Sequence, residues 1–220
     1  ELDIDMKLNW KLATDTFGET YHYPKLHKDT LVKLYHGNNL SFEEFGRHHR
    51  FVTANRRIDD LRDLPEDQCS ITQAAFVLYY LFPNIQLVTT STGANIARVY
   101  PDPDGPGRSI TRVVGYFSPR ALEQYEMEEA KAPDSNKLVE GQDLYAKAND
   151  QNTIRTPAST VEAFASTVSA EDYVMGEHQQ RAATCGLLEH SIFGHNEAPL
   201  HHFHKSYREA LGRPPLEKVT

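Results

Sequence analysis

Residues 70–117 contain the feature that most constrains the fold, a series of apolar runs separated by short turn sequences. The runs cover residues 74–82, 85–90, 95–100 and 109–117, and the turns are Pro83-Asn84, Thr92-Gly93 and the Pro- and Gly-rich segment 101–107. Runs of this length between such turns are typical of β-strands. Because short turns join consecutive strands that run antiparallel, the block predicts an antiparallel meander.

The elements on either side of this block have weaker patterns. Residues 1–8 alternate apolar and polar side chains, which predicts a half-buried strand. Thr16 and Glu19 fit a capping box, which predicts a helix from Thr16 to His22. The other expected elements are a polar strand over 46–55 and helices over 121–130, 138–148, 169–188 and 199–211. A sheet with helices segregated from it is an α+β fold.

Length and composition indicate one globular domain, because 220 residues can bury a continuous core. The net charge of −8 argues against a nucleic-acid surface and favours a small-molecule site. No run approaches the 18 apolar residues of a membrane span. Cys69 and Cys185 are too few for a disulfide framework, so we expect a reducing, cytoplasmic location.

The strongest chemical signal is a pair of histidines, His22 and His27, with Glu19 three residues before the first. On an unbroken helix, residues five apart lie about 140° from each other and could not both face one metal ion. Pro24 removes a backbone donor and disfavours helix at the residue before it, so a helix should end near His22. His27 can then fold back, while Glu19 is placed to orient an imidazole.

A carboxylate that could complete such a site is Asp172. The segment Ser169–Asp172 is also a capping box, in which the carboxylate only satisfies the start of a helix. Glu171 is the adjacent rival, but it lies about 100° around the helix and should point elsewhere if Asp172 faces the sheet. Two histidines and one carboxylate suit either Fe(II) or zinc.

Several short motifs recur in an order known from one protein family. They are Asn9-Trp10-Lys11 before Glu19, His22 and His27, then Phe82-Pro83-Asn84, then Glu171-Asp172 followed by Gln180, Gly186-Leu187 and Phe203-His204-Lys205-Ser206-Tyr207. This pattern resembles the catalytic domain of Rieske non-haem iron oxygenases, the aromatic-ring-hydroxylating oxygenase α subunits.

The resemblance implies specific roles for the residues of these motifs. His22, His27 and Asp172 would be the ligands of a mononuclear Fe(II). Glu19 would be the bridge that carries electrons from a Rieske cluster in the neighbouring subunit. Thr16 and Phe17, where the family more often has Asn and Phe, are expected to line the substrate pocket.

The resemblance also implies an architecture and a set of partners. The family has a helix-grip fold, in which a curved antiparallel sheet wraps a long C-terminal helix and encloses an apolar cavity. A Rieske [2Fe-2S] cluster needs two Cys and two His, normally in C-x-H and C-x-x-H pairs. Neither pair occurs here, so the chain is expected to be a catalytic domain whose Rieske domain lies upstream of Glu1.

The activity that the family implies is the hydroxylation, as mono- or cis-dihydroxylation, or the dealkylation of an aromatic or other hydrophobic substrate. Electrons would come from NAD(P)H through a reductase and, in some systems, a ferredoxin. The expected assembly is a head-to-tail homotrimer, with or without β subunits.

Two other functions remain open from the sequence. A non-redox helix-grip domain that binds a hydrophobic ligand has the same fold but gives His22, His27 and Asp172 no reason to converge. A zinc hydrolase on the same three residues is the other alternative.

The remaining polar candidates have simpler interpretations. His201, His202 and His204 are expected to be surface or helix-packing residues, and Cys185 a small buried residue. His48 and His49 point to opposite faces of a strand, so at most one lines the cavity.

Overall fold

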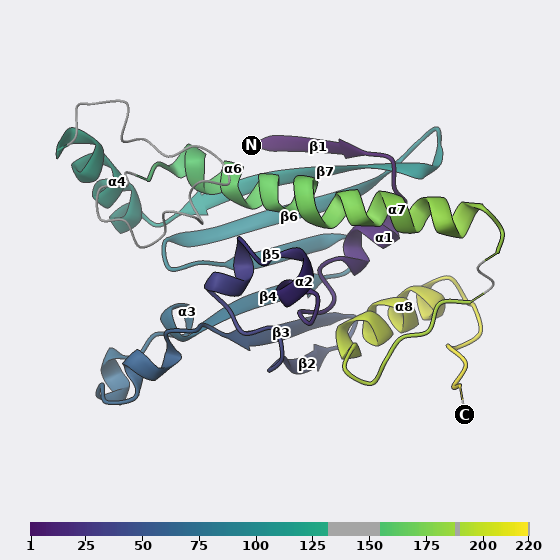
Figure 1. The fold of residues 1–220 in the computed structure, drawn as a ribbon, viewed down its shortest axis with the longest axis horizontal. Coiled ribbons are helices and arrows are strands. Elements are labelled where there is room, and N and C mark those ends of the chain that lie inside the picture. Colours follow the sequence, from purple (N-terminus) through teal and green to yellow (C-terminus); the bar gives the residue numbers. More distant parts are fainter. Residues whose placement is uncertain (132–154, 188–189, 220) are drawn as a thin grey trace.

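The computed structural model describes residues 1–131, 155–187 and 190–219, so the expected helix over 138–148 lies outside the described residues. Its centre is one seven-stranded antiparallel sheet with the order β1-β7-β6-β5-β4-β3-β2 (Figure 1). The strands are β1 (Leu2–Met6), β2 (Ser41–Phe45), β3 (His48–Ala54), β4 (Ala75–Leu81), β5 (Ile85–Thr89), β6 (Gly93–Asp102) and β7 (Gly105–Phe117).

The predicted meander is confirmed, because β4, β5, β6 and β7 pair in this order in antiparallel register. The polar strand expected over 46–55 is present as β3, which pairs with β4. The strand expected at the N-terminus is also present, and β1 pairs with β7 at one edge of the sheet. The opposite edge strand, β2, was not predicted. Its side chains are almost all exposed, so it lacks the apolar alternation that identifies a half-buried strand.

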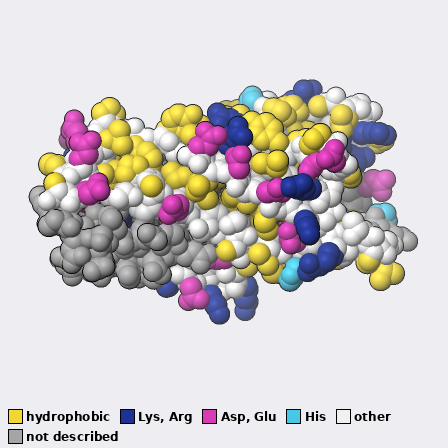
Figure 2. Space-filling model, turned by 90° about the horizontal axis from the view of Figure 1, so that it is seen from above, with side chains coloured by type: hydrophobic (Ala, Val, Ile, Leu, Met, Phe, Trp, Pro, Cys, Tyr) yellow, Lys and Arg dark blue, Asp and Glu magenta, His cyan; other side chains and the backbone are white. Residues whose placement is uncertain are grey.

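The exposed edge strand β1 is rich in charge. Arg112 binds Asp3 at 2.9 Å between its Nε and Oδ1, and Arg108 binds Asp5, so both ion pairs join β1 to β7. Seen from above in Figure 2, the molecule carries Lys and Arg beside Asp and Glu among its hydrophobic side chains. Charges on an edge strand disfavour pairing with the edge of another sheet.

The helices lie between and around the ends of these strands. They are α1 (Trp10–Asp15), α2 (Tyr23–Leu26), η1 (Leu31–Lys33), η2 (Ile58–Leu61), η3 (Glu66–Gln68), α3 (Ile71–Ala74), α4 (Pro119–Lys131), α6 (Pro157–Thr167), the π-helical turn η5 (Val168–Asp172), α7 (Tyr173–Thr184) and α8 (Ala198–Ala210). Figure 1 shows α6 and α7 as one long helix that runs across the sheet over β6 and β7. No helix among the described residues combines the length and apolar character that crossing a membrane requires.

The predicted helix from Thr16 to His22 is wrong. The helix begins earlier, at Trp10, because the Asn9 side chain accepts a hydrogen bond from the backbone N–H of Lys11 at 2.9 Å. Thr16 then closes the other end of α1, where its hydroxyl donates to the carbonyl of Ala13 at 2.9 Å. A Cβ at Gly18 would lie 2.0 Å from a side-chain carbon of Leu200, so the chain turns tightly against α8 here.

The long C-terminal helix also begins earlier than predicted. Its start is a capping box in which Thr156 and Ser159 exchange two hydrogen bonds of 3.0 Å, and it ends at Thr184. The alternative capping role of the segment 169–172 is therefore wrong, since these residues lie within a continuous helix. Cys185 follows this helix and is exposed, which corrects the expectation of a buried residue.

The motifs near the two ends of the chain pack against one another. The backbone N–H of Asn9 donates to the Gln180 side chain at 2.9 Å. The ring of Tyr207 lies 5.0 Å from that of Trp10 and 4.9 Å from that of Phe82, measured between centroids. Aromatic rings at these separations stabilise each other beyond their apolar burial. These contacts join α1, α7 and α8 to the end of β4, and so hold α1, which precedes the segment that carries both histidines.

Candidate metal centre and the adjoining cavity

Three of the predicted site residues converge beneath the long helix. Nε2 of His27 lies 3.0 Å from Nε2 of His22 and 3.2 Å from Oδ1 of Asp172, and the third side of the triangle is 3.4 Å. His22 and His27 flank the one-turn helix α2, while Asp172 ends the π-helical turn. Among the described residues, these three form the one group of His, Cys, Asp or Glu that is arranged to hold a metal ion.

The opposite nitrogen of each imidazole faces a carboxylate. Nδ1 of His27 lies 2.6 Å from Oε2 of Glu171, and Nδ1 of His22 contacts Oε1 of Glu19. An ionised carboxylate only accepts hydrogen bonds, so each Nδ1 carries a proton and donates it. Both Nε2 atoms are then left with lone pairs that point toward each other, an arrangement that requires a cation or a proton between them.

The spacing of the three donor atoms fits a single shared ion. Ligands 2.0–2.2 Å from a metal lie about 3.0 Å apart at an octahedral angle and about 3.4 Å apart at a tetrahedral angle. The observed separations of 3.0, 3.2 and 3.4 Å fall within these limits. Two imidazoles and one carboxylate on one face are the ligand set of non-haem Fe(II) enzymes, and they also suit zinc.

The charges at the site favour a bound cation. Burial by itself lowers the pKa of His22, but its hydrogen bonds with Asp172 and Glu19 outweigh burial and raise this pKa to about 9. Burial raises the pKa of Asp172, whereas the two histidines lower it further and leave it below its usual value. The site therefore holds a carboxylate together with a positive charge, which is the charge that a metal ion would supply.

Glu171 lies in the site, which corrects the expectation that it points elsewhere. Its carboxylate accepts from Nδ1 of His27 and also from the hydroxyl of Thr30 at 3.0 Å. The wide π turn and the longer Glu side chain let Glu171 reach one side of the imidazole while Asp172 reaches the other. π turns within α-helices are frequent at functional sites.

A cavity of about 170 Å³ opens beside the triad. The predicted pocket residues Thr16 and Phe17 both line it, together with aromatic and aliphatic side chains from the sheet and the long helix. The other lining residues are Glu19, His22, Tyr23, His27, Leu31, Tyr35, Phe51, Phe76, Leu78, Val88, Thr89, Thr90, Asn95, Thr160, Ala163, Phe164, Thr167, Val168 and Asp172.

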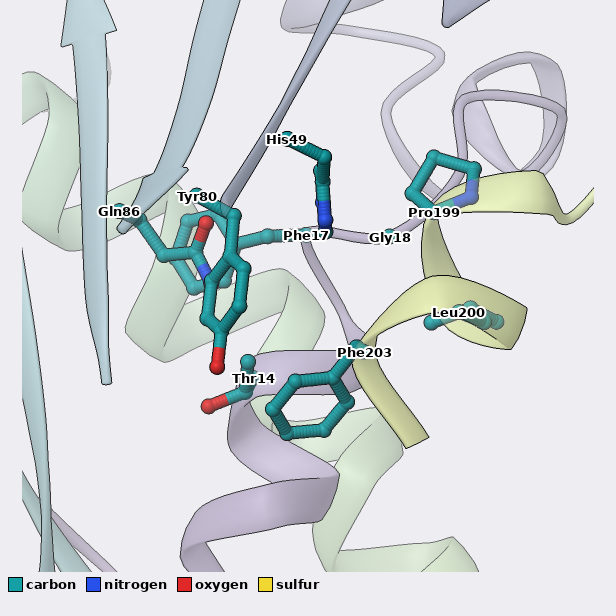
Figure 3. Close-up of a pocket in the computed structure, with 9 residues that line it drawn as sticks. All are labelled: Thr14, Phe17, Gly18, His49, Tyr80, Gln86, Pro199, Leu200 and Phe203. Carbon is teal, nitrogen blue, oxygen red and sulfur yellow. The ribbon is translucent and has the colours of Figure 1, made fainter. Parts of the chain in front are cut away.

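A second cavity, of about 10 Å³, shares Phe17 with the first and is shown in Figure 3. His49 and Gln86 line it, and its volume is about that needed by one water molecule. Nδ1 of buried His49 lies 2.9 Å from Nδ1 of His202, whose Nε2 donates to the carbonyl of Gly46 at 2.8 Å. His49 therefore lines this smaller cavity and not the larger one.

The other histidines of α8 make local contacts. His202 is buried against His49, while His201 lies near the carbonyl of Gly194 at 3.0 Å. Nε2 of His204 lies 2.8 Å from Oδ1 of Asp15, a carboxylate that the sequence spacing did not reveal. These contacts hold α8 against α1 and β3.

The match to a protein family covers nearly the whole chain. A model described as the catalytic domain of the ring hydroxylating α subunit matches residues 1–213. The chain belongs to this family. No curated protein sequence matches it significantly.

Solved structures of Rieske oxygenases resemble this chain in fold. A crystal structure of the quaternary ammonium Rieske monooxygenase CntA with an inhibitor has a TM-score of 0.51 at 13% identity, and the match covers 83% of this chain and 38% of that one. The apo form of CntA gives 0.51 at 12% identity, over 96% of this chain and 45% of that one. The chain thus spans less than half the length of these similar structures.

Proposed function

We propose that this chain is the catalytic domain of a Rieske-type oxygenase and that His22, His27 and Asp172 hold a mononuclear Fe(II). The observation that carries the proposal is the convergence of two Nε2 atoms and one carboxylate oxygen within 3.0–3.4 Å in a member of this family. When bound, the iron supplies the activation of O2, and the protein supplies binding, orientation and a dry cavity.

The chain's own residues have separable tasks in this proposal. Glu19 and Glu171 hold the Nδ1 protons, and this keeps both Nε2 lone pairs directed at the metal. The apolar cavity places a substrate beside the triad and excludes water from it. In this proposal three residues coordinate the metal, so its remaining coordination positions stay available to O2 and substrate.

Electron delivery is proposed to pass through Glu19. Its carboxylate contacts Nδ1 of His22, so it touches the back of a metal ligand. In the intact protein, a Rieske [2Fe-2S] domain upstream of Glu1 would be reduced by NAD(P)H through a reductase, with or without a ferredoxin. A head-to-tail homotrimer, with or without β subunits, would bring a neighbour's cluster beside Glu19.

The cavity favours a mainly hydrophobic substrate. Among the described residues, neither Lys nor Arg lines it, so a substrate carboxylate would find no lysine or arginine partner there. The similar CntA structures are of quaternary ammonium monooxygenases, and aromatic walls can also hold such a cation. The products expected of such an oxygenase are monohydroxylated or cis-dihydroxylated rings, or compounds from which an alkyl group on a heteroatom has been removed.

Metal content and O2 uptake test this proposal together. The intact subunit loaded with Fe(II) and supplied with its reductase should consume O2 only when a hydrophobic substrate is present. Activity that requires zinc and consumes no O2 would support the hydrolase instead. Ligand binding that is unaffected by removing the metal-binding side chains, with no O2 uptake, would support the non-redox binding domain.

A further inference from the structure

Asn95 is a polar side chain in the apolar cavity, and its hydrogen-bonding groups are unused by the described part of the protein. Asn95 lines the cavity and is only 4% exposed. Among the described residues, its side-chain amide has no hydrogen-bond partner. Because the amide faces the cavity and bonds to no other protein group, it is placed to bond a ligand there.

The position of Asn95 in the sheet fixes where its side chain points. Its Cα is paired with Val88 on β5, Val88 with Leu78 on β4, and Leu78 with Phe51 on β3. Residues paired across strands share a face, so these four side chains form one row on the helix-covered face. All four line the cavity, and Asn95 is the polar member of the row.

The hydroxyl groups nearby already have acceptors. The hydroxyls of Thr16, Thr160 and Thr167 each donate to a backbone carbonyl at 2.9 Å. Tyr35 is the other lining residue whose polar group has no partner among the described residues, and its ring packs edge-on to Phe76 at 5.2 Å. Asn95 and Tyr35 are therefore the two candidates to bind a polar group of a ligand.

We propose that Asn95 is the hydrogen-bonding anchor of the cavity, and that the substrate is a single-ring molecule with an uncharged polar group such as a carbonyl or hydroxyl. The inference rests on the proposed function and names its substrate class. A cavity of about 170 Å³ is close to the engineered cavity of about 150 Å³ that holds benzene, which sets the size at one substituted ring. A quaternary ammonium group offers Asn95 no hydrogen bond, so it would leave the amide unpaired.

A pair of probes with the same shape tests the anchor in the absence of iron. Acetophenone and ethylbenzene differ by a carbonyl in place of a methylene, and their binding to the chain is measured by calorimetry without added metal. We expect acetophenone to bind about tenfold more tightly, the value of one good hydrogen bond to an otherwise unpaired group. In Asn95→Leu the two probes should bind equally, whereas the control Thr160→Val, whose hydroxyl is already bonded, should keep the ratio.

Two further measurements keep the outcome decisive. Unliganded Asn95→Leu should melt at a temperature no lower than that of the wild type, because no other protein group bonds to the amide that it removes. A marked loss of stability would mean that the amide stabilises the fold, and this would overturn the proposal. Loss of the ratio in Tyr35→Phe but not in Asn95→Leu would assign the anchor to Tyr35. Tighter binding of phenyltrimethylammonium than of acetophenone would also refute the proposal of an uncharged polar substrate. None of these results bears on iron binding, so the anchor and the oxygenase proposal fail separately.

Discussion

Glu171 accepts a hydrogen bond from Nδ1 of His27 at 2.6 Å, on the side of the imidazole opposite Asp172. One π-helical turn therefore supplies both a candidate metal ligand and the group that orients another ligand. The arrangement fixes the tautomer of His27, which is 1% exposed and has little room to reorient.

Removal of Glu171 should weaken metal binding without removing a ligand. Glu171→Ala leaves Nδ1 of His27 unsupported, and loss of such an orienting partner typically lowers metal affinity 10–100-fold. Competition with a metal-sensitive dye measures the change. The control Glu162→Ala removes a carboxylate of α6 that contributes to neither the triad nor the cavity, and its affinity should stay at the wild-type value. Equal losses of metal affinity in both variants would contradict the role of Glu171 in orienting His27.

Glu19→Gln should separate metal binding from electron transfer in the intact subunit. Gln keeps the size and an acceptor oxygen for His22, so most of the iron should remain bound. It loses the charge proposed to link the Rieske cluster to the mononuclear site, so reoxidation of the cluster in a single turnover should slow to near background. Reoxidation at the wild-type rate would leave Glu19 with an orienting role alone.

The sequence predicted the sheet better than the helices around it. The strands from β4 to β7 have clear apolar runs and turn residues, and their antiparallel order follows from the short connections. The start of α1 was misplaced because Thr16 and Glu19 imitate a capping box, while Asn9 is the residue that caps the helix. Helix α6 was missed because its Ala, Ser and Thr side chains carry no strong apolar period.

The candidate site was predictable in part. The positions of His22, His27 and Asp172 were inferred from sequence motifs, and the structure brings their donor atoms together. Glu171 was misjudged because a π turn leaves no sign in the sequence, and an ordinary α-helix would have turned this side chain away. The unpartnered amide of Asn95 depends on the packing of four strands, which local sequence does not encode.

Protonation of His49 should limit stability in acid. Burial, together with nearby His202, lowers the pKa of His49 to about 3, against about 6.5 in an unfolded chain. Below pH 6.5 the unfolded chain binds a proton that the folded chain does not, so this stability is full above pH 6.5 and is lost as the pH falls. The free energy of unfolding should drop by about 2 kcal/mol between pH 7 and pH 5 from this residue. In urea titrations at several pH values, the free energy of unfolding of His49→Leu should lack this pH-dependent drop. An equal drop in the wild type and the variant would contradict the assignment.

Phe17 lines both cavities, so we expect its truncation to join them. Phe17→Ala should lower the free energy of unfolding by about 2–4 kcal/mol, slightly less than truncation of a fully buried aromatic residue, because Phe17 is only partly buried. It should also enlarge the cavity of about 170 Å³, so the affinity for naphthalene should rise relative to that for benzene. Calorimetry with benzene and naphthalene measures this change, and the exposed Phe45→Ala is the control. Unchanged selectivity would place the wall between the cavities elsewhere.

Iron stoichiometry in the chain and its triad variants tests the central proposal most directly. The wild-type chain, loaded anaerobically with Fe(II) and desalted, should retain one iron whose X-ray absorption shows nitrogen and oxygen ligands. Asp172→Ala and His22→Ala, checked for folding by circular dichroism, should each lose most of that iron, whereas Glu162→Ala should keep it. Retention of iron at the wild-type level by folded Asp172→Ala and His22→Ala would contradict a metal centre at His22, His27 and Asp172.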